Sequence, residues 1–196
     1  HLEGETVVVA VQRLGGRGAT LHLLVLGGSQ GARTLNQAVP AALALVGPAD
    51  IEVRHQAGPA GLAATRADYA ARAIPAEVEA FIGDMAAAYE WADLVICRAG
   101  ALTLAELCAA GVAAVLVPYP QAVDDHQTRN AALMVARGAA LRRAAPDHLD
   151  AQLAGTLGTL RGARPRLLAM SQGARALARA DAGQRIADAC LEGSRP

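Results

Sequence analysis

The sequence predicts an α/β fold, a Rossmann-like doubly wound parallel sheet of about six strands with helices on both faces. Three observations predict it. From residue 21 onward, short apolar runs alternate with alanine-rich stretches of helical length. The runs Leu21–Leu26 and Ala114–Val117 are largely apolar, as expected for strands that are covered on both faces. Alternating strands and helices joined by right-handed crossovers build a parallel sheet.

Each expected element is a run whose composition fits its type. The expected strands are Leu21–Leu26, Ile51–His55, Val78–Phe81, Leu94–Cys97, Ala114–Val117 and Ala140–Arg143. The expected helices lie near residues 32–46, 60–72, 85–91, 102–110, 127–137, 147–159, 165–179 and 182–191. Alanine dominates these helices because of its high helix propensity. In such a fold the ligand site lies at the carboxyl ends of the strands, where the strand order reverses.

Composition bounds the class of protein. The 196 residues predict one domain, placed at residues 21–196 with helices at its carboxyl end; residues 1–20 are left open as a leader, a linker remnant or an added segment. Hydrophobic residues make up 53% and charged residues 18%, which excludes intrinsic disorder. The net charge of zero argues against a nucleic-acid partner. All 18 basic residues are arginine, which excludes Schiff-base chemistry and a P-loop lysine.

Cysteine usage and hydropathy narrow the setting. The three cysteines, Cys97, Cys108 and Cys190, have no paired spacing. They fit buried small side chains in a reducing compartment, and neither a disulfide framework nor a zinc site. No apolar run reaches the roughly 20 residues that a membrane span needs.

The first strand runs into the glycine-rich segment Gly27–Ala32. Glycines let the backbone turn sharply, and the following helix offers free N–H groups and its positive dipole end to an anion. The segment therefore predicts a phosphate cradle to which Ser29 adds a hydroxyl. A tight turn with Ser29 as the helix N-cap explains the same residues equally well. The segment is not a G-x-G-x-x-G motif.

Gly27–Gly31 also matches G-x-S-x-G, the nucleophile elbow of serine hydrolases. Ser29 would then be the nucleophile. Its partners would be an acid and a histidine: Asp93 or Asp124, and His126 or His148. This alternative is less favoured, because the elbow normally follows a central strand that comes after several earlier ones, and here it follows the first strand.

A second glycine turn, Cys97–Thr103, follows the fourth strand. Two helix N-termini meeting at the point of strand reversal would suit a diphosphate. Glu106, one turn into the helix, could accept hydrogen bonds from two vicinal ribose hydroxyls. The spacing of Thr103 and Glu106 is also that of a capping box, which remains the alternative.

The fifth strand ends at Pro118–Pro120, where two prolines stop the strand. His126, Gln127 and Asn130 follow, and their side chains suit a hydroxyl-rich ligand because they donate and accept hydrogen bonds. A metal site would need more histidine or cysteine at ligand spacing. Asp124 and Asp125 more readily favour a helix N-terminus than bind a metal.

Together these segments resemble the carboxyl-terminal domain of the MurG family, bacterial N-acetylglucosaminyltransferases that convert lipid I to lipid II in peptidoglycan synthesis. The resemblance covers about residues 21–192. Its landmarks occur in family order: Gly27–Arg33 with Leu35 and Asn36, His55–Gly58, Phe81–Met85 with Ala88 and Tyr89, Ala92–Ala101, Thr103, Glu106, Pro118–Pro120, and Asp125–Gln127 with Asn130.

The resemblance implies the donor-binding half of a GT-B glycosyltransferase, with UDP-N-acetylglucosamine as the donor. The resemblance also implies which residues would surround this donor. Ile82 would meet the uracil through its backbone, and Glu106 would bind the ribose. The diphosphate would be bound by Ser29 and by the backbone of Ala101, Leu102 and Thr103. The sugar would contact His126 and Gln127, with Asn130 supporting that loop and Gln30 and Arg98 lining the site.

The resemblance further implies inversion at the sugar carbon without a metal or other cofactor. It implies that the family's amino-terminal domain, which carries the lipid I site and the membrane patch, is absent from these residues, either excised or supplied by a separate chain. We therefore expect no catalytic residue in this chain and no activity of the chain alone. We expect this fragment to be soluble and the full enzyme to be peripheral to the cytoplasmic face of the bacterial inner membrane. Cell-wall synthesis there supports cell shape and division. Another UDP-sugar transferase or epimerase remains the alternative.

Overall fold

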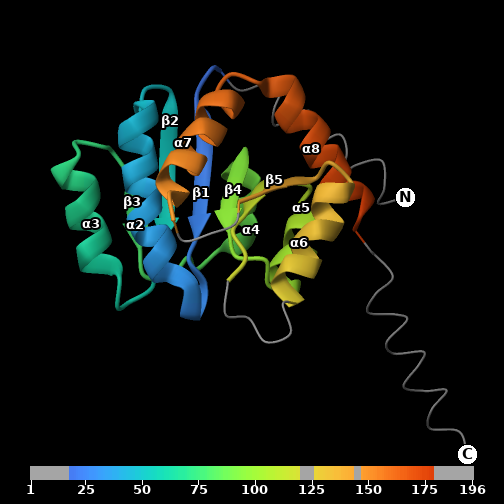
Figure 1. The fold of residues 1–196 in the computed structure, drawn as a ribbon, viewed down its shortest axis with the longest axis horizontal. Helices are drawn as coiled ribbons and strands as arrows, with labels where there is room; N and C mark the ends of the chain where they lie inside the picture. Colours follow the sequence, from blue (N-terminus) through green and yellow to red (C-terminus); the bar gives the residue numbers. More distant parts are fainter. Residues whose placement is uncertain (1–17, 120–125, 144–146, 179–196) are drawn as a thin grey trace, which may run out of the picture.

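The structure, a computed structural model, contains one sheet of six parallel strands with helices on both faces (Figure 1). It describes residues 18–119, 126–143 and 147–178, and for residues 29–32 it describes the backbone alone. The strands lie in the order β3-β2-β1-β4-β5-β6, and every neighbouring pair is parallel. The predicted doubly wound parallel sheet is therefore confirmed.

The bounds of the elements follow the sequence prediction closely. The strands are β1 (Leu21–Leu26), β2 (Ile51–Gln56), β3 (Glu77–Glu79), β4 (Leu94–Cys97), β5 (Ala113–Leu116) and β6 (Ala140–Arg142). The helices are α2 (Gly28–Val46), α3 (Leu62–Ala71), α4 (Met85–Trp91), α5 (Ala101–Ala110), α6 (His126–Ala136), α7 (Leu149–Leu160) and α8 (Arg164–Ala176). The largest difference is at α2, which begins four residues earlier than expected. The helix expected near residues 182–191 lies outside the described residues.

The central strands bury both of their faces, and each face has its own hydrophobic core. On β1, Leu21, Leu23 and Val25 join the core under α2 and α7, whereas Leu24 and Leu26 join the core under α4 and α5. Successive side chains of a strand point to opposite faces, so a strand covered on both faces needs apolar residues at nearly every position. This is why β1 was recognisable from its sequence.

The strand order places the point of reversal between β1 and β4. β2 and β3 lie on one side of β1, and β5 and β6 lie beyond β4. In Figure 1 the strand arrows point toward the lower edge of the sheet, where α2 and α6 begin. A ligand of a doubly wound sheet is expected at this carboxyl edge, beside β1 and β4.

At the opposite, amino edge of the sheet, a buried ion pair ties three segments together; we call it the amino-edge anchor. Asp93 is completely buried, and one of its carboxylate oxygens accepts hydrogen bonds from the Arg164 guanidinium at 2.8 Å and the His22 backbone N–H at 3.0 Å. Arg164 also donates to the backbone carbonyls of Gly18 and Thr20. The anchor joins the start of α8 to the start of β1.

The two cysteines in the described residues are both buried, as the sequence predicted. Burial, reinforced by the nearby Glu106 carboxylate, raises the pKa of Cys97 to about 12. Burial also raises the pKa of Cys108, so neither side chain is a ready thiolate nucleophile. Cys190 lies outside the described residues. Among the helices that the structure describes, none has both the length and the apolar character needed to cross a membrane.

Candidate functional site

The first glycine turn is tighter than the sequence indicated. Gly27 is the N-cap of α2, so Gly28 and Ser29 already belong to the first helical turn. The interpretation of Ser29 as the N-cap is therefore wrong, because the glycines start the helix earlier. Gly28 has a φ of 69°, which favours glycine, and a Cβ added there would meet nothing within 4 Å. The first backbone N–H groups of α2 have no partner inside the helix and are available to an anion. The side chains of Ser29 and Gln30 lie outside what the structure describes.

The second glycine turn places another helix N-terminus beside the first. Gly100 is the N-cap of α5, with an extended backbone and no side-chain cap. The first helical hydrogen bond runs from the Leu104 N–H to the Gly100 carbonyl at 3.0 Å. The N–H groups of Ala101, Leu102 and Thr103 therefore have no acceptor inside the helix. These are the three backbone groups that the sequence analysis assigned to a diphosphate.

The capping-box alternative for Thr103 and Glu106 is wrong. A capping box needs Thr103 at the N-cap, but Gly100 occupies that position and Thr103 is the third residue of the helix. The Glu106 carboxylate instead accepts a hydrogen bond from the Tyr89 hydroxyl of α4, with 2.9 Å between the oxygens. Glu106 therefore has a tertiary partner, which the sequence analysis did not identify.

Ile82 and Phe81 occupy the turn between β3 and α4. The Ile82 side chain is buried in the core under α4 and α5, together with Tyr89. Its side chain is thus committed to packing, which leaves its backbone as the part that can meet a ligand. Phe81 is 67% exposed, unusual for a large aromatic side chain, and no role was predicted for it. Asp84 then caps α4 by accepting a hydrogen bond from the Ala87 N–H at 2.9 Å.

Arg98 fastens the turn after β4 to the end of β5. Its guanidinium donates to the backbone carbonyls of Val117 at 3.0 Å and Pro118 at 3.3 Å. It also lies over the Tyr119 ring, 5.4 Å from the centroid. Burial lowers the pKa of Arg98, but an arginine stays charged at neutral pH. The predicted lining role is untested, and the structure adds a bracing role.

Two of the predicted sugar-side residues also brace these loops. The Gln127 side-chain oxygen accepts a hydrogen bond from the Tyr119 backbone N–H at 2.9 Å. The Asn130 amide donates to the Ala99 carbonyl at 3.2 Å, so α6 is joined to the turn after β4. His126 is exposed at the first position of α6. Residues 120–125, with Asp124 and Asp125, lie outside the described residues.

The positions of Asp93 and Ser29 exclude Asp93 as the acid of a serine hydrolase triad. Asp93 precedes β4 and lies at the amino edge, where Arg164 and His22 use its carboxylate. Ser29 follows β1 at the opposite edge. Since β1 and β4 run parallel in register, at least four residues of strand, or about 13 Å, separate them. Asp93 therefore cannot orient a histidine beside Ser29.

A buried polar network that was not predicted lies under the turn after β2. Asn36 donates from its amide nitrogen to the Ala57 carbonyl, and its oxygen lies 3.0 Å from His55 Nε2. His55 Nε2 must therefore carry the proton, and His55 Nδ1 accepts the hydrogen bond from the Tyr69 hydroxyl at 2.9 Å. The alternation Ile51, Val53, His55 along β2 could have revealed it, because it places His55 on the buried face.

This network makes the stability of the chain depend on pH. Burial lowers the pKa of His55 to about 4, because charging a ring inside the core is costly. A proton on Nδ1 would also remove the acceptor of the Tyr69 hydroxyl. In the unfolded chain this pKa is about 6.5. The stabilisation is therefore complete above pH 6.5 and is lost as the pH falls toward 4. We therefore expect the free energy of unfolding to fall by about 2 kcal/mol when the pH is lowered from 7.5 to 5.

Urea denaturation at both pH values measures this difference. His55→Gln keeps a donor and an acceptor but does not titrate, so its pH-dependent loss should be smaller by about 2 kcal/mol. His148→Asn is the matched control, since it removes an exposed imidazole at a φ of 61° that asparagine tolerates. Equal pH dependence in the wild-type chain and in His55→Gln would contradict the assignment.

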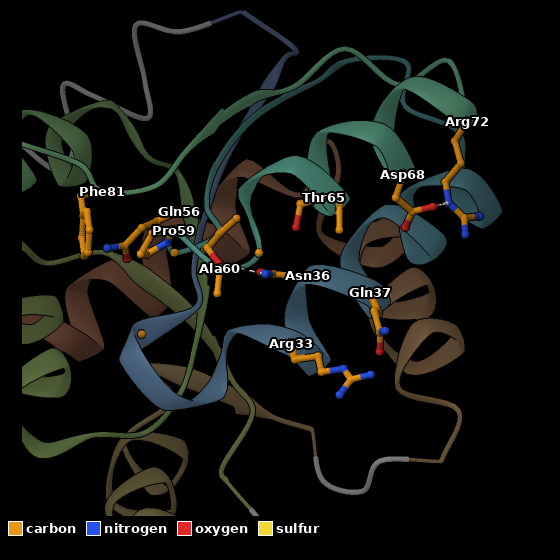
Figure 2. A pocket seen from close by; sticks show the side chains of 15 residues that line it. Arg33, Asn36, Gln37, Gln56, Pro59, Ala60, Thr65, Asp68, Arg72 and Phe81 are labelled. Atoms are coloured by element: carbon orange, nitrogen blue, oxygen red, sulfur yellow. Dashed lines mark hydrogen bonds and ion pairs between the residues drawn. The ribbon is translucent and has the colours of Figure 1, made fainter.

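A pocket of about 960 Å³ lies between α2 and α3, close to the carboxyl end of β2 (Figure 2). Arg33 and Gln37 on α2 and Asp68 and Arg72 on α3 are among the lining residues that Figure 2 labels. None of the predicted donor residues whose side chains the structure describes lines this pocket. It meets the predicted site only at the carboxyl edge, where Gly28, Gln56 and Phe81 line it. Within the described ranges, no three His, Cys, Asp or Glu side chains gather as metal ligands would.

The class of protein follows from the strand order, the two helix N-termini at its reversal, and solved structures of similar fold. The MurG crystal structure from Acinetobacter baumannii matches with a TM-score of 0.77 and 43% identity, covering 88% of this chain and 52% of that one. The kitacinnamycin glycosyltransferase has a TM-score of 0.57 at 24% identity, which supports the fold alone. The fold is that of the GT-B glycosyltransferases.

The chain belongs to the glycosyltransferase family 28 C-terminal domain family, whose model matches residues 22–186. A UDP-N-acetylglucosamine--N-acetylmuramyl-(pentapeptide) pyrophosphoryl-undecaprenol N-acetylglucosamine transferase from Xanthomonas campestris pv. campestris (strain 8004) is 58% identical over 180 residues, which is 92% of this chain and 42% of that protein. The enzyme of the same name from Marinobacter nauticus is 55% identical over 182 residues, with 92% and 50% covered. The chain thus spans about half the length of these relatives. The predicted membership of the MurG family is confirmed.

Proposed function

We propose that residues 21–196 are the donor-binding half of the enzyme that transfers N-acetylglucosamine from UDP-N-acetylglucosamine to lipid I. The product would be lipid II, used in peptidoglycan synthesis at the cytoplasmic face of the membrane. The relatives that are more than half identical to the chain carry the name of this transferase. The observation that carries the proposal is the pair of helix N-termini, of α2 and α5, at the reversal of strand order.

These two N-termini would bind the diphosphate of the donor. Each offers backbone N–H groups and the positive end of a helix dipole. The first turns of both helices contain no acidic side chain that would compete with a phosphate. During transfer the leaving UDP gains negative charge, and fixed N–H groups would stabilise that charge without reorganisation. Inversion without a bound metal is part of this proposal.

Glu106 would bind the ribose of the donor. Its carboxylate lies on α5, close enough to the buried Cys97 at the carboxyl end of β4 to raise the pKa of that thiol. A carboxylate oxygen accepts more than one hydrogen bond, so the bond from Tyr89 leaves acceptor sites for two vicinal hydroxyls. The uracil would lie against the backbone of Ile82, and the sugar beside α6 and the side chains of His126 and Gln127.

Isothermal titration calorimetry tests the proposal. The wild-type chain is expected to bind UDP and UDP-N-acetylglucosamine, and Glu106→Ala should weaken binding by about 1–3 kcal/mol, since it removes hydrogen bonds to a charged group. Glu52→Ala removes the same charge from an exposed position near the amino end of β2 and should leave the affinity unchanged. Unchanged UDP affinity in Glu106→Ala would exclude the ribose role.

A panel of UDP-sugars separates the proposed donor from its alternatives. UDP-N-acetylglucosamine should raise the melting temperature more than UDP-glucose or UDP-N-acetylgalactosamine, because only the cognate sugar satisfies the groups around it. A larger shift with another UDP-sugar would favour a different transferase or an epimerase. Labelling of Ser29 by a fluorophosphonate would instead favour the serine hydrolase.

A further inference from the structure

In the described residues, two buried tyrosines each form a hydrogen bond through their hydroxyl group. Tyr69 on α3 bonds to His55, within the network under the turn after β2. Tyr89 on α4 bonds to Glu106, at the edge where the donor is proposed to bind. Both rings are nearly inaccessible, 2% and 5% exposed. The two rings are thus alike in burial, but the hydroxyl of Tyr69 bonds to a histidine and that of Tyr89 to a carboxylate.

The Tyr89 ring is fixed before it reaches Glu106. It packs in the core under α4 and α5 together with Ile82, Ala88 and Leu107. Burial, and then the hydrogen bond to the Glu106 carboxylate, raise the pKa of Tyr89, so its hydroxyl keeps its proton at neutral pH. The rigid ring fixes the position of this hydroxyl, which donates to one oxygen, Oε2, of Glu106.

This bond restricts the side chain of Glu106. A glutamate has three side-chain torsions, and ordering them costs free energy on binding unless the protein has already ordered them. The hydrogen bond from a fixed tyrosine supplies that order in the empty chain. It also leaves Oε1 and a second lone pair of Oε2 for other donors.

We propose that Tyr89 is a positioning residue that holds the Glu106 carboxylate in the orientation needed to accept both ribose hydroxyls of the nucleotide. The inference rests on the proposed function, in which Glu106 binds the ribose. Tyr89 itself makes no contact with the nucleotide in this account. It acts through Glu106, and it therefore contributes to the selection of a ribonucleotide over its deoxy form.

A double-mutant cycle on the 196-residue chain tests this account. Tyr89→Phe keeps the buried ring and removes only the hydroxyl, and we expect it to weaken UDP binding about three- to tenfold. In the Glu106→Ala background the same change should have no effect on UDP affinity, because the group on which Tyr89 acts is gone. Tyr89→Phe should also cost less for 2′-deoxy-UDP, which lacks one of the two hydroxyls.

Tyr69→Phe is the control, since it removes the hydroxyl of another buried tyrosine ring, one whose partner is His55. It should lower the melting temperature but leave UDP affinity as in the wild-type chain. Wild-type UDP affinity in Tyr89→Phe, or an equal loss in the Glu106→Ala background, would overturn the positioning role while leaving the proposed function intact. Absence of UDP binding by the wild-type chain would instead overturn the proposed function.

Discussion

Replacing Asp93 with alanine is expected to lower the free energy of unfolding by about 3 kcal/mol. Removing one partner of a buried ion pair is costly because the remaining charge loses its compensation. Asp93 is fully buried, and its carboxylate serves both Arg164 and the backbone N–H of His22. We place the effect at the lower end of the usual range because Arg164 keeps its bonds to the carbonyls of Gly18 and Thr20.

Urea denaturation of the variant at neutral pH measures this effect. Asp68→Ala is the control, because Asp68 forms a partly exposed ion pair with Arg72 one helical turn away, at 2.9 Å. Such pairs contribute about 0.3–0.5 kcal/mol. A loss in Asp93→Ala no greater than that of the control would show that the amino-edge anchor does not stabilise the fold.

The 196-residue chain by itself is expected to transfer no N-acetylglucosamine to lipid I above background. Transfer needs the acceptor hydroxyl aligned with the sugar carbon and a base to take its proton. The resemblance to the family implies that the groups for both lie on the amino-terminal half. The candidate bases, His126 and Asp125, are expected on the donor side, against the sugar; Asp125 lies outside the described residues.

A radiolabelled-donor assay with a lipid I analogue tests this expectation. The amino-terminal half of a relative such as the Xanthomonas enzyme, added as a separate polypeptide, should restore turnover if the halves dock. UDP binding by the same preparation serves as the control for folding. Robust turnover by the 196 residues alone would show that a catalytic group has been assigned to the wrong half.

The fold was predictable because burial leaves a direct mark on composition. Both faces of β1 and β4 are covered, so their residues are apolar at almost every position and their bounds were predicted correctly. The start of α2 was not predicted, because a glycine-rich turn and a glycine-rich first helical turn have the same composition. In a glycine-rich segment the backbone conformation determines where the helix begins, and the pattern of apolar side chains gives no information about that position.

For the candidate site, the sequence predicted the loops but not the contacts between their side chains. Glycines after β1 and β4 identified the two helix N-termini, and the parallel topology required them to meet. The bond between Tyr89 and Glu106 was not predicted, because it depends on how α4 packs beside α5. The same holds for Asn130 and Ala99, which lie 31 residues apart. The spacing of Thr103 and Glu106 along the chain was also compatible with a capping box. The structure excludes it, because α5 begins before Thr103.

The amino-edge anchor has a consequence for how the chain acquires its structure during synthesis. β1 is made first among the described strands, yet its neighbour β4 and the guanidinium of Arg164 come about 70 and 140 residues later along the chain. Closing such distant contacts is slow, and until then an apolar strand lacks its cover. A ribosome-bound chain that ends before α8 should therefore remain a client of chaperones, and release of residues 164–176 should be the step after which it resists proteolysis.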